Sequence, residues 1–176
     1  MSQHLDDLKI QDTQLIKGPK GHLTWYGNGK FSVKPLGKPL EERKCAQIGM
    51  MAGGTGITPM LQILHDVFRE QSYPPVRAKL IFANQTEDDI LVRTELETLA
   101  KDFPNHFSLR YTLDRPPKKW DHSSGFITED MVKEHLLFNN DKPTQFFMCG
   151  PPPMIKFACL PALKAAGYSE KDWVVY

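Results

Sequence analysis

Apolar residues recur with two different periods after residue 45, and each period predicts a different kind of element. Between residues 59 and 70 they fall on one face of a helix, at Met60, Ile63, Leu64, Val67 and Phe68. Elsewhere they form short, nearly continuous runs that are typical of buried parallel strands. The pattern predicts strands at 46–52, 78–84, 107–113, 144–150 and 172–176, alternating with helices at 59–70, 91–103, 128–136 and 152–167. Such alternation predicts an α/β fold, with a five-stranded parallel, Rossmann-like sheet covered by helices on both faces.

The beginning of the chain follows a different pattern. Short β-like pieces at 14–18, 22–27 and 30–34 are separated by Gly-Pro and Gly-Asn-Gly, which indicates hairpins of a small antiparallel sheet or barrel. Residues 34–44 are rich in proline, glycine and charge and are typical of a linker. The sequence therefore predicts a small β unit over residues 1–33, a linker at 34–44 and the α/β domain at 45–176.

Composition narrows the classes of function. The 22 basic and 21 acidic side chains nearly cancel, which argues against a nucleic-acid partner. The three cysteines are widely spaced and the six histidines are scattered, so neither set has the spacing of a metal site, and free thiols are expected. No basic segment followed by an apolar stretch opens the chain, and no run is long enough for a transmembrane helix. The sequence thus predicts a soluble, cytoplasmic protein.

Two glycine-bearing turns follow predicted strands that should be neighbours. With the strand order 3-2-1-4-5, the ends of strands 1 and 4 flank the crevice where such sheets bind ligands, and these ends carry "AGGTGITPM" and "CGPPPM". Each turn opens a helix, with Thr58 as the expected N-cap and Pro59 at the first helical position. A pyrophosphate fits a helix N-terminus. A glycine turn is also often only a turn, and Pro59 departs from the usual GxGxxG spacing.

Three further residues are candidates at this edge. Asp114 follows strand 3, where a carboxylate accepts hydrogen bonds from ribose hydroxyls and repels a 2′-phosphate; it is equally suited to a turn. Cys149 precedes a helix N-terminus, a place that lowers the pKa of a thiol, although no histidine nearby in sequence would act as its base. Tyr176 ends the last strand and either packs at the sheet edge or reaches the crevice.

Long motifs in this order resemble the NADH-cytochrome b5 reductases of the ferredoxin-NADP reductase superfamily. The resemblance rests on "GMMAGGTGITPMLQIL", "LIFANQTEDDIL", "YTLDRPP", "GFITEDM" and "MCGPPPMI" and covers essentially the whole chain. Residues 1–31 resemble the last strands of that family's flavin domain, and the family's Arg-x-Tyr-Ser/Thr and Gly-Gly-Lys motifs, which precede them, are absent. The resemblance therefore implies a reductase that lacks most of the FAD-binding barrel.

The resemblance also implies cofactors, a partner and site residues. NADH would give a hydride to FAD, which would pass single electrons to cytochrome b5. Thr58 and Cys149 would be the catalytic residues. The implied cofactor-binding residues are Met1, Ser2, Gly53, Gly54, Thr55, Gly56, Ile57, Thr58, Pro59, Gln85, Asp114, Phe126, Cys149, Gly150, Pro151 and Met154. The alternative is a non-catalytic NADH-binding module that does not hold FAD tightly, because the few β pieces cannot close a barrel.

Overall fold

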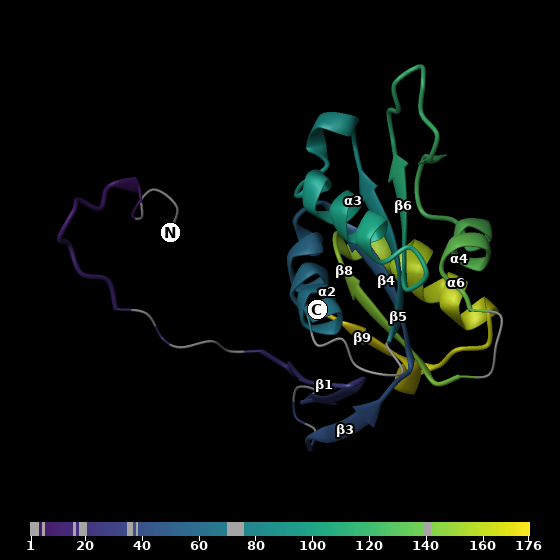
Figure 1. Ribbon diagram of the computed structural model, residues 1–176, viewed down its shortest axis with the longest axis horizontal. Coiled ribbons are helices and arrows are strands. Elements are labelled where there is room, and N and C mark those ends of the chain that lie inside the picture. The colour runs from purple at the N-terminus through teal and green to yellow at the C-terminus, as the bar shows by residue number, and fades with distance from the viewer. Residues whose placement is uncertain are drawn as a thin grey trace.

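A parallel six-stranded sheet forms the centre of the computed structural model, which describes residues 4, 6–15, 17, 21–34, 37, 39–69, 76–138 and 142–176. The strands are β4 (Gln47–Gly53), β5 (Arg77–Asn84), β6 (Phe107–Leu113), β7 (Ser123–Ser124), β8 (Thr144–Cys149) and β9 (Trp173–Val175). They lie in the order β7-β6-β5-β4-β8-β9 (Figure 1). The predicted order of the five main strands is confirmed. The sixth strand, β7, consists of two serines and so gave no apolar signal.

Helices cover both faces of this sheet, as predicted. On one face lie α2 (Ile57–Arg69) and α3 (Arg93–Asp102), and on the other lie α4 (Glu129–His135) and α6 (Leu160–Ala165) (Figure 1). Each face has its own buried apolar cluster, because side chains of a strand alternate between the faces. Among the described residues, no helix combines the length and the apolar character needed to cross a membrane.

The last predicted helix, 152–167, is divided into three parts. A short helical turn, α5 (Pro152–Met154), leads into a π-helical segment, η3 (Ile155–Cys159), which continues as α6. Pro161 lies in the first turn of α6 and has no N–H to donate to the carbonyl four residues earlier.

A small antiparallel sheet lies at the amino-terminal side of the chain. Its strands are β1 (Leu23–Gly27), β2 (Lys30–Val33) and β3 (Glu41–Lys44), in that order across the sheet. Two predictions are wrong here: residues 14, 15 and 17 form no strand, and the last four residues of the predicted linker pair with β2 as β3. All four residues of β3 are charged and none is fully buried, so this edge strand gave no apolar signal.

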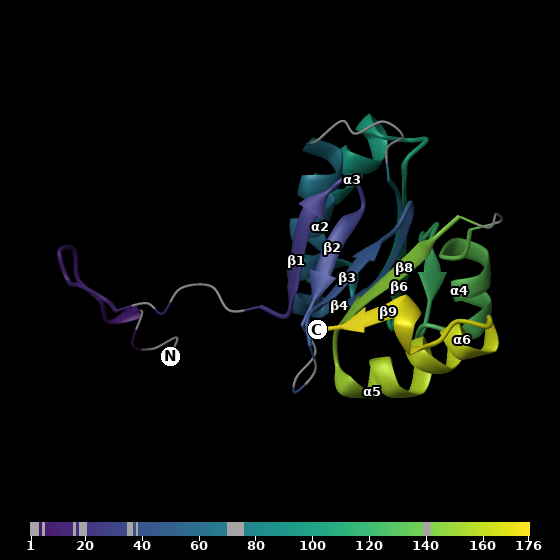
Figure 2. The same cartoon turned by 90° about the horizontal axis from the view of Figure 1, so that it is seen from below.

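The small sheet packs onto the large one through aromatic side chains. Phe31 is 1% exposed; its ring lies edge-on to that of Phe147 on β8, with 5.5 Å between centroids, and stacks on Trp25 at 5.8 Å. The guanidinium of Arg43 on β3 donates to the carbonyl of Lys171 at 3.0 Å, just before β9. The small sheet lies beside β4 and α2 (Figure 2). Phe31 therefore belongs to the core, and Trp25 packs against it.

Candidate functional site

The two glycine turns meet at the point where the strand order reverses. Strands β4 and β8 are parallel neighbours, so the turns that follow them lie on the same edge of the sheet. A Cβ at Gly56 would overlap the carbonyl oxygen of Cys149, and a Cβ at Gly150 would lie 3.1 Å from the amide nitrogen of Gly53. The turns thus pack backbone against backbone, and Gly56 and Gly150 are required by that contact whether or not a ligand binds.

Gly54 differs from these glycines. Its φ is +53°, and a Cβ there would meet no atom within 4 Å. The residue therefore leaves its backbone open at the N-terminal end of α2, where a helix presents unpaired N–H groups and partial positive charge. Of the glycines in this turn, Gly54 is the position where a phosphate group has room to approach the chain.

The helix after the first turn begins earlier than predicted. Residues Gly54–Gly56 form a 3₁₀ turn, and α2 starts at Ile57, so Thr58 is already helical and the prediction that it is the N-cap is wrong. Its hydroxyl donates to the carbonyl of Thr55 at 3.1 Å. Pro59 lies in the first helical turn, where its missing N–H costs no internal bond. Thr58 is exposed and remains at the edge that the sequence indicated.

The second turn is built from Cys149, Gly150 and Pro151, which introduces α5. The side chain of Met154 folds back over both turns: its Sδ atom lies 2.9 Å from the position of a Cβ on Gly53, and its methyl group fills the space beside Gly150. These four residues come together as the resemblance implied. They give this end of the switch point an apolar surface with one thiol.

Burial raises the pKa of the Cys149 thiol, so the expectation of a lowered pKa at this helix N-terminus is wrong. The phenol of Tyr176 is a neighbour: burial and the nearby Cys149 raise its pKa to about 12. The amide of Tyr176 donates to the carbonyl of Met148 at 2.9 Å, which extends the β8–β9 pairing. Tyr176 therefore reaches the switch point, and both side chains are neutral at pH 7. A neutral thiol is a poor nucleophile.

Further along the same edge, the ends of β5 and β6 carry polar side chains. Asp114 is exposed, and its amide donates to the carbonyl of Asn84 at 3.1 Å. The next residue, Arg115, donates from its amide to the carbonyl of Gln85 and from its guanidinium to Oε1 of Gln85, both at 2.9 Å. Phe126 is 80% exposed. Gln85 and Asp114 thus directly follow the neighbouring strands β5 and β6, and Phe126 lies two residues after β7; their roles as nucleotide contacts stay a prediction.

Sequence reasoning missed Arg115, although the printed sequence held a usable signal. An arginine directly after the candidate carboxylate stands at the same strand end and carries the opposite charge. Met1 and Ser2, the two remaining predicted cofactor contacts, lie outside the described residues.

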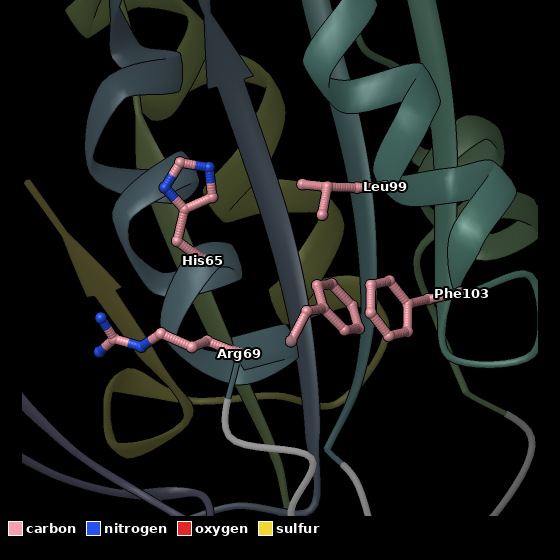
Figure 3. A pocket seen from close by; sticks show the side chains of 5 residues that line it. His65, Arg69, Leu99 and Phe103 are labelled. Atoms are coloured by element: carbon pink, nitrogen blue, oxygen red, sulfur yellow. The ribbon is translucent and has the colours of Figure 1, made fainter.

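A groove on the surface lies away from these residues. It has a volume of about 380 Å³ and is lined by His65, Phe68, Arg69, Leu99 and Phe103. Figure 3 shows His65 and Arg69 on α2 opposite Leu99 and Phe103 near the end of α3. Both helices run away from the carboxyl edge of the sheet, so this groove lies toward the opposite edge. It contains none of the predicted site residues.

Comparison with known proteins agrees with the fold and the motifs. Residues 50–160 match the model of a family described as the oxidoreductase NAD-binding domain, and the chain belongs to this family. It is 51% identical to NADH-cytochrome b5 reductase 2 of Xenopus laevis and 48% identical to NADH-cytochrome b5 reductase 1 of Homo sapiens. Both alignments cover all of this chain but only 59% and 57%, respectively, of the two relatives.

A solved structure gives the same result. The cytochrome b5 reductase domain of Ulva prolifera nitrate reductase is 40% identical and superposes with a TM-score of 0.88, over 99% of this chain and 63% of that one. The sequence-based resemblance to NADH-cytochrome b5 reductases is therefore confirmed. The chain spans less than two thirds of the length of these proteins.

Proposed function

We propose that this chain carries the NADH-binding half of a flavin-dependent reductase of the NADH-cytochrome b5 reductase type. The observation that carries the proposal is the packing of the two glycine turns at the switch point, with Gly54 left open at the start of α2. A dinucleotide needs a place where its pyrophosphate can approach the backbone closely, and a helix N-terminus supplies one.

Residues on both sides of this place have complementary roles. Asp114, at the end of β6, accepts hydrogen bonds from the adenosine ribose and repels a 2′-phosphate, which favours NADH over NADPH. Gln85 and Phe126 are further contacts of the nucleotide. On the other side, Cys149, Gly150, Pro151 and Met154 flank the nicotinamide. Burial keeps the Cys149 thiol and the Tyr176 phenol uncharged, so they place no negative charge beside the ring.

FAD, when bound, accepts the hydride of NADH and releases the electrons singly, and cytochrome b5 is the proposed acceptor. Thr58 fits the flavin side of the site, because it is exposed at the start of α2, four residues after Gly54 and on the same edge of the sheet. Its hydroxyl is held by the carbonyl of Thr55 and keeps a lone pair for a further donor.

The alternative, an NADH-binding module that does not hold FAD tightly, has one observation in its favour. In the described part of the chain, the antiparallel sheet consists of three strands, too few to close a barrel around a flavin. The two functions share the NADH site and differ in whether added FAD is retained.

An absorbance and binding experiment on the purified chain separates them. NADH is titrated by calorimetry into protein that has been freed of flavin, and FAD is then added and the protein is desalted. Retained yellow colour that bleaches with NADH supports the reductase. NADH binding with a colourless protein after desalting supports the module. If neither NADH nor NAD⁺ binds at millimolar concentration, both proposals are wrong.

A further inference from the structure

Arg115 is a cation at the carboxyl edge that the proposed function leaves without a role. It follows Asp114 at the end of β6, and its two hydrogen bonds to Gln85 join the ends of β6 and β5. One bond is between backbone groups and the other reaches from the guanidinium to the side-chain oxygen of Gln85. The guanidinium therefore extends from the end of β6 to the end of β5.

The order of the strands shows in which direction the side chain of Arg115 extends across the sheet. The sheet runs β6-β5-β4, so a side chain that leaves β6 toward β5 also moves toward β4. Gly54, where the backbone is open, follows β4 directly. The guanidinium thus lies over the end of β5, the strand between β6, which Asp114 follows, and β4, which Gly54 follows.

The charge of Arg115 is available to an anion. Three arginines of the described chain form contact ion pairs: Arg43 with Glu41 at 2.7 Å, Arg69 with Asp66 at 2.6 Å and Arg93 with Glu97 at 2.7 Å. Like Arg77 and Arg110, Arg115 has no contact ion pair among the described residues; its guanidinium is held instead by the neutral amide of Gln85.

Asp89, an acid near Arg115, is occupied elsewhere. Its carboxylate accepts from the amide and the hydroxyl of Thr86, at 2.9 and 2.6 Å. These bonds, more than the charge of Arg115, lower its pKa. A positioned guanidinium without a contact carboxylate is suited to bind a phosphate through charge-assisted hydrogen bonds.

We propose that Arg115, positioned by Gln85, binds the pyrophosphate of the dinucleotide between the ribose contact and the glycine turn. The proposal rests on the proposed NADH site and adds a binding residue to it. Because the pyrophosphate is common to NADH, NADPH and ADP, Arg115 contributes to the affinity for all three and leaves the preference for NADH to Asp114.

The test compares ligands with and without phosphate on the full chain. Calorimetric titrations with ADP, adenosine, NADH and NADPH are made for the wild type, Arg115→Gln and Lys118→Gln. Lys118 is an exposed cation three residues further on, so Lys118→Gln matches the change of net charge. We expect Arg115→Gln to weaken ADP and both dinucleotides roughly tenfold, the scale of one charge-assisted hydrogen bond, and to leave adenosine and the NADH:NADPH ratio unchanged. Lys118→Gln should change the affinities less than twofold.

A double-mutant cycle tests the role of Gln85. Gln85→Leu should weaken ADP binding roughly threefold when Arg115 is present and by a smaller factor in the Arg115→Gln background, where the part of its effect that acts through the arginine is absent. An Arg115→Gln variant that binds ADP like the wild type overturns the proposal. A variant in which only the affinity for NADPH falls also overturns it, because Arg115 would then bind the 2′-phosphate. If the wild type binds neither ADP nor NADH, the NADH site itself is wrong.

Discussion

The two halves of the candidate site differ in construction: one is formed by packed backbone and the other by exposed side chains. The glycine-turn half, Gly53, Gly56, Gly150, Pro151 and Met154, is a piece of closely packed backbone that leaves no room for an added Cβ at its glycines. The side-chain half, Gln85, Asp114, Arg115 and Phe126, consists of exposed groups on the ends of β5, β6 and the segment after β7. One half provides shape and the other provides charge.

This difference teaches where stability and binding are linked. In the glycine-turn half, the same close contact holds β4 to β8 and forms the surface offered to a ligand, so a substitution changes both properties. In the side-chain half, the exposed groups contribute little to the folded state, because a surface contact of this kind is worth at most about 1 kcal/mol. Substitutions there should change binding alone.

The largest effect is expected for Gly56→Ala. The added methyl group would overlap the carbonyl oxygen of Cys149, and neither backbone can move without separating the turns. We expect the free energy of unfolding in urea to fall by about 3 kcal/mol, at the upper end of overpacking effects, with loss of NADH binding. Gly21→Ala is the control, since a Cβ there lies 3.8 Å from its nearest neighbour. A Gly56→Ala protein of wild-type stability would show that the turns are not in contact.

A smaller, selective effect is expected for Asp114→Thr in the other half. Loss of the carboxylate removes the repulsion of a 2′-phosphate, so the affinity for NADPH should rise toward that for NADH, by roughly tenfold in their ratio. The midpoint of urea unfolding should stay within the scatter of the wild type, because Asp114 is exposed. Parallel titrations with NADH and NADPH check this. An unchanged ratio would remove Asp114 from the ribose site.

A smaller loss of stability than for Gly56→Ala is expected for Gly54→Ala, because Gly54 lies in the glycine turn but has open space around it. Its φ of +53° costs an alanine about 1 kcal/mol. Gly167→Ala is a matched control, since Gly167 also has a positive φ, +88°, and nothing near a Cβ. Both variants should lose similar stability in urea, whereas Gly54→Ala alone should weaken NADH. Equal NADH affinities would contradict an approach of the pyrophosphate at Gly54.

Much of the large sheet could be predicted from the sequence because apolar periodicity reports burial. The strands from β4 to β9, except β7, and the meeting of the two glycine turns follow from it. Elements that are short or polar gave no such signal: the four charged residues of β3 and the two serines of β7 do not resemble buried strands. The N-terminus of α2 was misplaced because its 3₁₀ turn lets the helix begin before the expected cap at Thr58.

Within the candidate site, positions were predicted better than chemical properties. The order of the strands places Gln85 and Asp114 at the same edge as Cys149, independently of the contacts that their side chains make. The pKa of Cys149 is raised by burial, which depends on the folded chain around it, whereas local rules for helix N-termini gave the opposite direction. The bond from Arg115 to Gln85 likewise joins residues 30 positions apart.

The contact between Phe31 and Phe147 has a consequence for how the chain folds. Phe31 and Val33 of the small sheet belong to the same apolar cluster as Met50 of β4 and Leu64 of α2. Loss of the small sheet would expose that cluster to water, so the two sheets should melt in one cooperative transition. The smallest piece of this protein able to refold should therefore begin upstream of β1 rather than at residue 45.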